Sequence, residues 1–334
     1  MSTALAKSER RTSNEPLTDT KNLIRPLVAF DGGNRTIQWV DPLSNVHTIP
    51  SFIKPIDPTW EDVSPDENSM VIEFEGSTFV VGQVAKDLSG SPVFEKDKVK
   101  LARLLVLTAL EPMPGADAVR VERLAIALPN SRNDADVESL KAIEGTHEFT
   151  RNGQTIIATV RKVEPVDETV AAYRYATQQG LFLSKRNTNG VLDLGGGTSI
   201  LRLYSVSGSL MREADLILPG TFDLARRIAA RITRDLSASP DLSLIMDGIE
   251  AGDFMLGTTG YCFHAAFESA REQWLEDIRG QIKTRWGQWL ANLGEVLIIG
   301  GSAPIAAPLQ EATKGRFKIA PNPQTISIVG MLGL

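Results

Sequence analysis

The sequence predicts an α/β protein made of two similar domains. One observation is the length of 334 residues, which is long for a single domain. The other is a pattern that occurs twice: an apolar run, an aspartate with glycines, and a second apolar run. It begins at Asp31-Gly-Gly-Asn and again at Asp193-Leu-Gly-Gly-Gly-Thr. Each copy is typical of two strands joined by a glycine turn. We therefore expect each copy to form the first two strands of one domain.

Apolar periodicity and turn residues predict the elements in order. Strands are expected at 27–30, 36–40, 121–128, 154–163, 191–194, 198–204 and 295–299, with a hairpin over 71–82. Helices are expected at 96–110, 135–145, 168–179, 221–236, 263–290 and 303–313. Strands and helices that follow one another in this way favour an α/β architecture.

The domain boundaries follow from changes in composition. Residues 1–24 are polar without apolar periodicity, which is typical of a flexible N-terminal tail. The first domain is expected over 25–180, with a small insertion at about 50–95 that begins in a proline-rich stretch. The second domain is expected over 181–334, with a small subdomain at about 225–290. The apolar last residues are expected to pack back on the first domain.

The composition disfavours several classes of function. The single cysteine and three widely separated histidines make a metal site of protein side chains alone unexpected. A net charge of −6 argues against direct nucleic-acid binding by the folded body. No apolar run is long enough to cross a membrane, and the N-terminus has no apolar segment of a secretory signal. We therefore expect a cytoplasmic protein that does not bind membranes.

The first glycine turn, Asp31-Gly-Gly-Asn-Arg-Thr, could bind a phosphate group. Without a Cβ in the way, its backbone N–H groups can approach phosphate oxygens. The aspartate can hold the water shell of Mg²⁺, which keeps most of its waters when bound. The alternative is a plain hairpin turn of two strands.

Two later glycine turns have the same character. Asp193-Leu-Gly-Gly-Gly-Thr198 has three successive glycines, more than a simple hairpin needs. Gly300-Gly301-Ser302 follows a buried strand and precedes a helix, where backbone often lies against a ligand. The alternatives are a hairpin for the former and a tightly packed β–α turn for the latter. Neither a GxxxxGK[ST] loop nor a GxGxxG motif occurs, which disfavours Walker A and Rossmann sites.

The order of these motifs, with an acid-headed helix between the first two, resembles the superfamily of actin, sugar kinases and 70-kDa heat-shock proteins. The resemblance covers nearly the whole chain from about residue 27. The opening Asp31-Gly-Gly-Asn-Arg-Thr-Ile-Gln-Trp and the loop Ile299-Gly-Gly-Ser-Ala are most similar to plasmid-segregating actins of the ParM type. The resemblance implies an actin-like (ribonuclease H-like) fold, in which two α/β domains flank a cleft for ATP and Mg²⁺.

The resemblance also implies roles for single residues. Asp31 and Asp193 would organise Mg²⁺ through water, and Thr198 would contribute its hydroxyl. The backbone would hold the β- and γ-phosphates at Gly32, Gly33, Asn34, Gly195, Gly196 and Gly197. The adenosine would lie against Gly300, Gly301 and Ser302. Thr36 and Gln38 are further nucleotide-binding candidates, although Gln38 stands where the family pattern often has a lysine and brings no charge.

The catalytic candidates are Glu168, Asp167 and Asp193. In the actin-like family that this sequence resembles, the residue that positions the attacking water lies at the start of the connecting helix, before two alanines. Glu168 fits this place before Ala171-Ala172, and Asp167 is the alternative when the match shifts by one position. An acidic residue there could instead simply compensate the helix dipole. In the catalytic role it would orient water toward the γ-phosphate.

Three functions agree with this pattern. The first is an actin-like ATPase that polymerises into dynamic filaments and segregates plasmid DNA through a DNA-binding adaptor protein. The second is a small-molecule kinase of the sugar or acetate type, for which no second catalytic signature is found. The third is a non-polymerising regulator that uses nucleotide as a switch.

Overall fold

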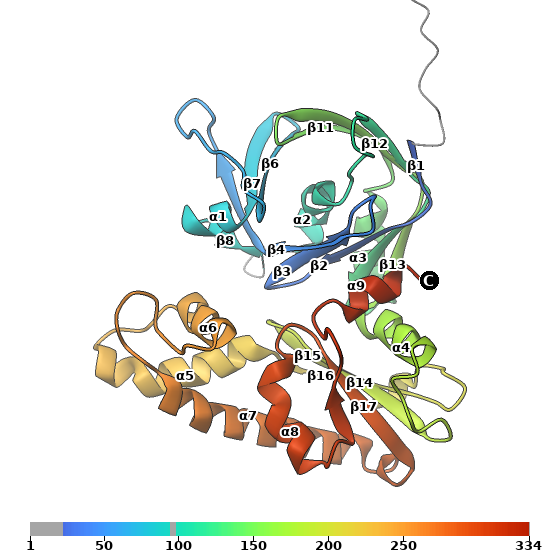
Figure 1. Cartoon of the computed structure of the whole chain (residues 1–334), viewed down its shortest axis with the longest axis vertical. Coiled ribbons are helices and arrows are strands. Elements are labelled where there is room, and N and C mark those ends of the chain that lie inside the picture. The colour runs from blue at the N-terminus through green and yellow to red at the C-terminus, as the bar shows by residue number, and fades with distance from the viewer. Residues whose placement is uncertain (1–22, 94–97, 334) are drawn as a thin grey trace, which may run out of the picture.

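The computed structural model describes residues 23–93 and 98–333, so nearly all of the predicted tail at 1–24 lies outside the described residues. The chain forms two halves, one above the other in Figure 1. Strands up to Asp167 build the upper half, and strands from Thr188 onward build the lower half.

The two halves contain central sheets of the same design. The upper sheet consists of β2 (Val28–Gly32), β3 (Thr36–Val40), β4 (Val46–Pro50), β10 (Leu124–Leu128) and β13 (Val163–Asp167). The lower sheet consists of β14 (Thr188–Leu194), β15 (Thr198–Tyr204), β16 (Leu216–Pro219), β17 (Leu293–Ile299) and β18 (Phe317–Ile319).

The strand orders are β13-β10-β2-β3-β4 and β16-β15-β14-β17-β18. In each sheet the first three strands along the chain are antiparallel neighbours, and the last two add in parallel beside the first. Every residue of β10 is buried, as expected for a strand of a sheet that is covered on both faces. The prediction of two similar α/β domains is confirmed.

Two predicted strands were wrong as single elements. The run 121–128 divides into β9 (Ala118–Val121) and β10, and the run 154–163 divides into β12 (Gln154–Val160) and β13, in different sheets. At both breaks the chain passes from one sheet to the other through charged residues. Arg161 Nη1 lies 3.0 Å from Glu122 Oε2 there. An apolar run marks burial but not the sheet with which a strand pairs.

The upper half also has an eight-stranded sheet, which curves around α2 (Lys98–Leu105) in Figure 1. Its strands are β1 (Ile24–Arg25), β5 (Phe52–Ile56), β6 (Ser69–Phe74), β7 (Ser77–Gly82), β8 (Ser91–Pro92), β9, β11 (Gly145–Arg151) and β12. The helix α1 (Gln83–Asp87) packs against its strands β5 and β7, whereas α3 (Asp134–Lys141) contacts α2 and β13 of the central sheet. The predicted hairpin is confirmed by β6 and β7, whose turn residues Glu75 and Gly76 both have positive φ.

Two helices, α4 (Glu168–Gln178) and α9 (Ile326–Met331), lie between the central sheets (Figure 1). Ala171 of α4 packs in a cluster with residues of the upper sheet such as Ala29. Ala172 and Ala176, on another side of α4, pack with Val191 of the lower sheet. The helix α4 therefore connects the cores of the two halves.

The close approach of α9 to α4 depends on Gly330. A Cβ at this position would overlap the backbone carbonyl of Ala171. Replacing Gly330 with Ala is expected to reduce the free energy of unfolding by about 1–3 kcal/mol, because one helix must move away. Gly280→Ala, in the exposed middle of α7 with no atom within 4 Å of an added Cβ, should instead be neutral or stabilising. Denaturant unfolding of both variants tests this, and equal effects would contradict it.

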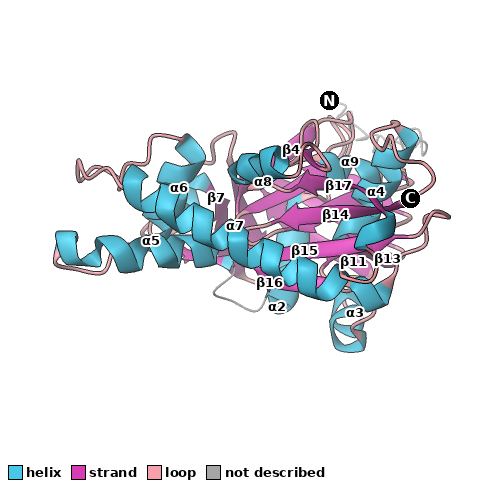
Figure 2. Cartoon of the chain, turned by 90° about the horizontal axis from the view of Figure 1, so that it is seen from below, coloured by secondary structure: helices cyan, strands magenta, loops and turns pink. Residues whose placement is uncertain are grey.

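The lower half carries the helices α5 (Thr221–Leu236), α6 (Leu242–Ala251), α7 (His264–Trp286) and α8 (Ala307–Ala312). Figure 2 shows α7 running across the strands, while α5 and α6 extend beyond the sheet. The helix α6 was not predicted, although Asp241 caps its start through Ser243 N–H and Gly252 ends it with positive φ. None of the helices in residues 23–93 and 98–333 is long and apolar enough to cross a membrane.

Candidate functional site

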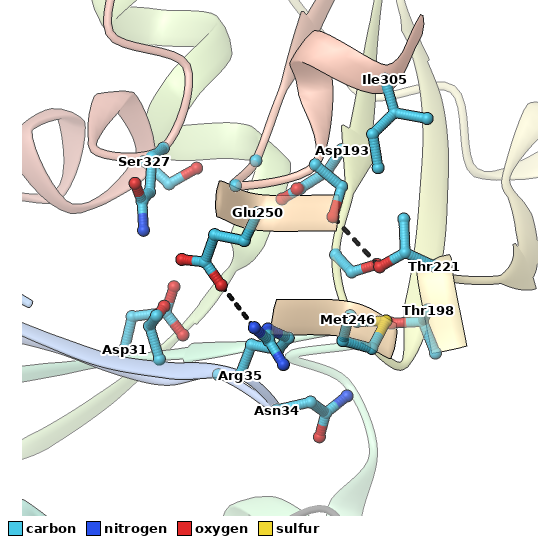
Figure 3. Close-up of a pocket in the computed structure, with 18 of the residues that line it drawn as sticks. Asp31, Asn34, Arg35, Asp193, Thr198, Thr221, Met246, Glu250, Ile305 and Ser327 are labelled. Atoms are coloured by element: carbon cyan, nitrogen blue, oxygen red, sulfur yellow. Dashed lines mark hydrogen bonds and ion pairs between the residues drawn. The ribbon is translucent and has the colours of Figure 1, made fainter. Parts of the chain in front are cut away.

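A cavity of about 210 Å³ lies between the two halves, where the three glycine turns meet (Figure 3). The turn between β2 and β3 contributes from the upper half. The turn between β14 and β15 and the turn after β17 contribute from the lower half. The fold thus brings the three sequence motifs to one place, because each turn lies at the same end of its central sheet.

The first two turns touch each other. A Cβ at Gly196 would lie 2.9 Å from Cγ of Arg35, and a Cβ at Gly197 would overlap the side-chain amide of Asn34. A Cβ at Gly195 would lie 2.9 Å from Thr198 O of its own turn. This contact explains three successive glycines where a hairpin alone needs fewer.

The third turn lies beside the second because β17 pairs in parallel with β14, with Ile299 opposite Asp193. Gly300 has a φ of 91°, and a Cβ there would lie 2.5 Å from Asp193 Oδ1. Both the backbone angle and the space require glycine at this position. Ser302 Oγ lies 3.1 Å from Thr221 Oγ1 at the start of α5, which joins the third turn to that helix.

Three carboxylates from three elements lie at the cavity: Asp31 at the end of β2, Glu168 at the start of α4, and Asp193 in β14. Burial, together with the negative charges of Glu168 and Asp31, raises the pKa of Asp193 well above its ordinary value. No group of three or more His, Cys, Asp or Glu in the described residues is arranged to hold a metal ion directly. The carboxylates fit a hydrated cation, held through its waters.

Glu168 and its neighbour Asp167 have different surroundings. Glu168 lines the cavity, whereas Asp167 does not and is only 6% exposed. Asp167 accepts a hydrogen bond from Ser131 N–H at 3.0 Å and pairs with Arg212 and Arg202. Burial alone would raise the pKa of Asp167, but the Ser131 N–H and the two guanidinium groups hold it below its ordinary value. Only Glu168 of these two can meet a ligand in the cavity.

The family model described as "Actin like proteins N terminal domain" matches residues 29–170. The chain has the actin-like fold. The solved structures agree, although no curated protein sequence matches. The ParM protein of psk41 without ligand is 17% identical with a TM-score of 0.67, over 92% of this chain and 96% of that chain. The archaeal actin homolog Ta0583 is 15% identical with a TM-score of 0.75, over 92% and 98%.

A 15-stranded ParM filament from Clostridium botulinum is 16% identical to this actin-like chain, with a TM-score of 0.75 over 92% of this chain and 97% of that chain. Ta0583 was also solved as a complex with ADP. The actin-like fold that the resemblance implied is therefore confirmed, and ParM proteins are among the structural neighbours.

Most of the predicted site residues line the cavity of this actin-like chain. They are Asp31, Gly33, Asn34, Thr36, Gln38, Glu168, Asp193, Gly195, Gly196, Thr198, Gly300, Gly301 and Ser302. Three predicted residues do not line it: Gly32, Gly197 and Asp167. Gly32 lies in β2 and Gly197 faces Asn34, so their lack of a side chain serves the packing of the turns.

Sequence reasoning missed other lining residues of the actin-like cavity: Arg35, Thr221, Met246, Ile249, Glu250, Pro304, Ile305, Gln324 and Ser327. Several of them belong to α6, the helix that was not predicted. Its Asp241 cap and closing Gly252 were readable signals for the helix. No local signal shows that α6 faces the glycine turns, because this depends on how α5 and α6 pack.

Proposed function

We propose that this actin-like chain is a cytoplasmic ATPase that binds Mg-ATP in the cavity between its halves. The convergence of three glycine turns on one cavity with three carboxylates is the observation that supports this best. Glycine turns expose backbone N–H groups to phosphate oxygens, and carboxylates attract the accompanying cation. The ADP complex of Ta0583 supports nucleotide binding in this fold.

The cavity is lined by both polar and apolar residues, which suit the two parts of a nucleotide. The β- and γ-phosphates would lie against the turns at Gly33 and Gly195-Gly196, near the Thr198 hydroxyl. Asp31 and Asp193 would hold the waters of Mg²⁺, which neutralises phosphate charge when bound. The base and ribose would lie toward Gly300, Gly301 and Ser302 and the apolar side chains Ile249 and Ile305.

In hydrolysis we assign the positioning of water to Glu168. Its carboxylate is at the cavity, whereas that of Asp167 is held by two arginines. A carboxylate there can accept a hydrogen bond from water and orient it for in-line attack on the γ-phosphate. Backbone N–H groups of the turns would stabilise the charge that develops on the phosphate oxygens.

The domain division that we propose is 25–180 for the first domain and 181–334 for the second. Residues 50–95 form the insertion of the first domain, and 225–290 form the small subdomain of the second. The separate hydrophobic clusters of the two halves support this division. The packing of Ile328 and Met331 beside Ala29 and Ala125 supports an attachment of the last residues to the first domain.

We also propose that the protein assembles into filaments whose stability depends on the bound nucleotide. Neighbours of the same fold that are described as filaments support this proposal. From the resemblance of the sequence motifs to plasmid-segregating actins, we propose that the cargo is plasmid DNA, which a DNA-binding adaptor protein links to the filament. The net charge of −6 agrees with indirect rather than direct contact with DNA.

Right-angle light scattering with purified protein and Mg²⁺, in parallel with phosphate release, tests this function. Scattering should rise on addition of ATP and decay as phosphate appears, and ADP should support less assembly. Nucleotide binding without scattering would indicate a nucleotide-switch regulator instead. Conversion of ATP to ADP that requires a small-molecule acceptor, with the phosphoryl group transferred to that acceptor, would indicate a kinase. Absence of any nucleotide binding would contradict the whole proposal.

A further inference from the structure

The cavity is strongly acidic for a site that takes a polyphosphate. Its lining includes the carboxylates of Asp31, Glu168, Asp193 and Glu250. Among the described residues that line it, Arg35 alone carries a positive charge. A nucleoside triphosphate and these carboxylates repel each other, and one Mg²⁺ offsets only part of their charge. A protein cation at the phosphates would therefore have a large effect on binding.

Arg35 lies at the place where such a cation would act. It belongs to the first glycine turn, and its stem passes over Gly196 of the second turn, where an added Cβ would lie 2.9 Å from Arg35 Cγ. Both turns line the proposed phosphate end of the cavity. Gln38, the other candidate on this strand pair, is neutral, and its side-chain amide donates to Thr48 Oγ1 at 3.2 Å.

The guanidinium of Arg35 is held by α6 of the other half. Its Nη2 lies 3.0 Å from Asp247 Oδ1 and also pairs with Glu250, as Figure 3 shows for the latter. Asp247 has a second partner, because Lys86 Nζ lies 2.7 Å from its Oδ2. If Arg35 leaves, Asp247 still has Lys86, and Glu250 is largely exposed to solvent. Moving Arg35 from these carboxylates to a phosphate therefore costs little free energy.

We propose that Arg35 is the protein cation that binds the phosphate chain of the nucleotide, and that Asp247 and Glu250 hold it across the cavity when no phosphate is present. The proposal rests on the proposed nucleotide site. Phosphate oxygens accept charge-assisted hydrogen bonds from a guanidinium as carboxylates do, so they compete for the same donors. Binding of ATP then exchanges an ion pair between the halves for one with the ligand.

Isothermal titration calorimetry with ATP and with adenosine, in Mg²⁺ buffer, tests this on three variants. Arg35→Gln is expected to weaken ATP binding by about 10- to 100-fold, the loss of a charge-assisted pair. Adenosine, which has no phosphate, should bind with unchanged affinity. Arg35→Lys keeps the charge and should recover part of the ATP affinity. Arg103→Gln is the matched control: it removes one positive charge, which pairs with Glu75 away from the cavity, and should change the ATP-to-adenosine ratio little.

Each of the other possible outcomes contradicts a specific part of the proposal. Equal losses for ATP and adenosine in Arg35→Gln would show that Arg35 only shapes the cleft. An unchanged ATP affinity in that variant, or an effect equal to that of Arg103→Gln, would show that Arg35 does not bind phosphate. If the unmodified protein binds neither ligand, the proposed nucleotide site itself fails. If it binds both and only the Arg35 variants behave otherwise than expected, the nucleotide site stands and Arg35 does not bind the phosphate chain.

Discussion

Glu168→Gln is expected to lower the rate of phosphate release by about 100-fold or more, while ATP still binds. The substitution keeps the size of the side chain but removes the charge that orients water. The carboxylate of Glu168 lines the cavity from the start of α4, opposite the glycine turns. In light scattering, assemblies formed with ATP should persist in this variant, because the hydrolysis that weakens them is slow.

A matched control for this prediction is Glu164→Gln on the preceding strand. Glu164 pairs with Arg123 and Lys162 and does not line the cavity. Phosphate release by the control should equal that of the unmodified protein. If Glu168→Gln releases phosphate as fast as the control, another group positions the water and the assignment of Glu168 is wrong.

Arg202→Met is expected to have the largest effect on stability, about 3–5 kcal/mol, because it breaks a buried ion-pair network. Arg202 is 1% exposed, and it lies 3.4 Å from Asp167 Oδ1 and 3.3 Å from Asp215 Oδ2. It also donates to Pro129 O of the upper half and, at 3.2 Å, to Thr169 Oγ1. Its removal leaves the buried carboxylate of Asp167 and the partly buried carboxylate of Asp215 with Arg212 as their remaining cation.

Guanidinium unfolding followed by tryptophan fluorescence measures this effect, since Trp274 and Trp286 are buried in the lower half. The control is Arg123→Met, whose ion pair with Glu164 is at the surface and should contribute about 0–1 kcal/mol. Equal losses in the two variants would contradict a special role of the buried network. Because Thr169 follows Glu168, Arg202→Met should also slow phosphate release at temperatures where the protein is folded.

Elements whose cause is local were predicted well. The glycine turns, the hairpin of β6 and β7, and the helices α4 and α5 depend on backbone angles and on apolar spacing over a few residues. The repeated pattern at Asp31 and Asp193 also predicted the two similar halves, because the same strand–turn–strand unit directs the same sheet order.

Elements whose cause lies in pairing were predicted poorly. The runs 121–128 and 154–163 were each predicted as one strand, yet each supplies residues to strands of two sheets and breaks at charged residues. The choice of a partner strand depends on which sheet edge lies nearby in the folded chain. The residue types of the strand do not indicate this edge. The eight-stranded sheet around α2 could not be predicted for the same reason.

The sequence by itself determined that three glycine turns exist, two of them beside an aspartate, and that the turns belong to two similar halves. The reason is that glycine and apolar spacing act on the backbone directly. Only the tertiary structure decided which side chains share the cavity. Glu168 and Asp167 are adjacent in sequence, but the start of α4 directs one to the cavity and leaves the other to Arg202 and Arg212. Arg35 meets α6 for the same physical reason: contacts between distant segments depend on how the two halves pack.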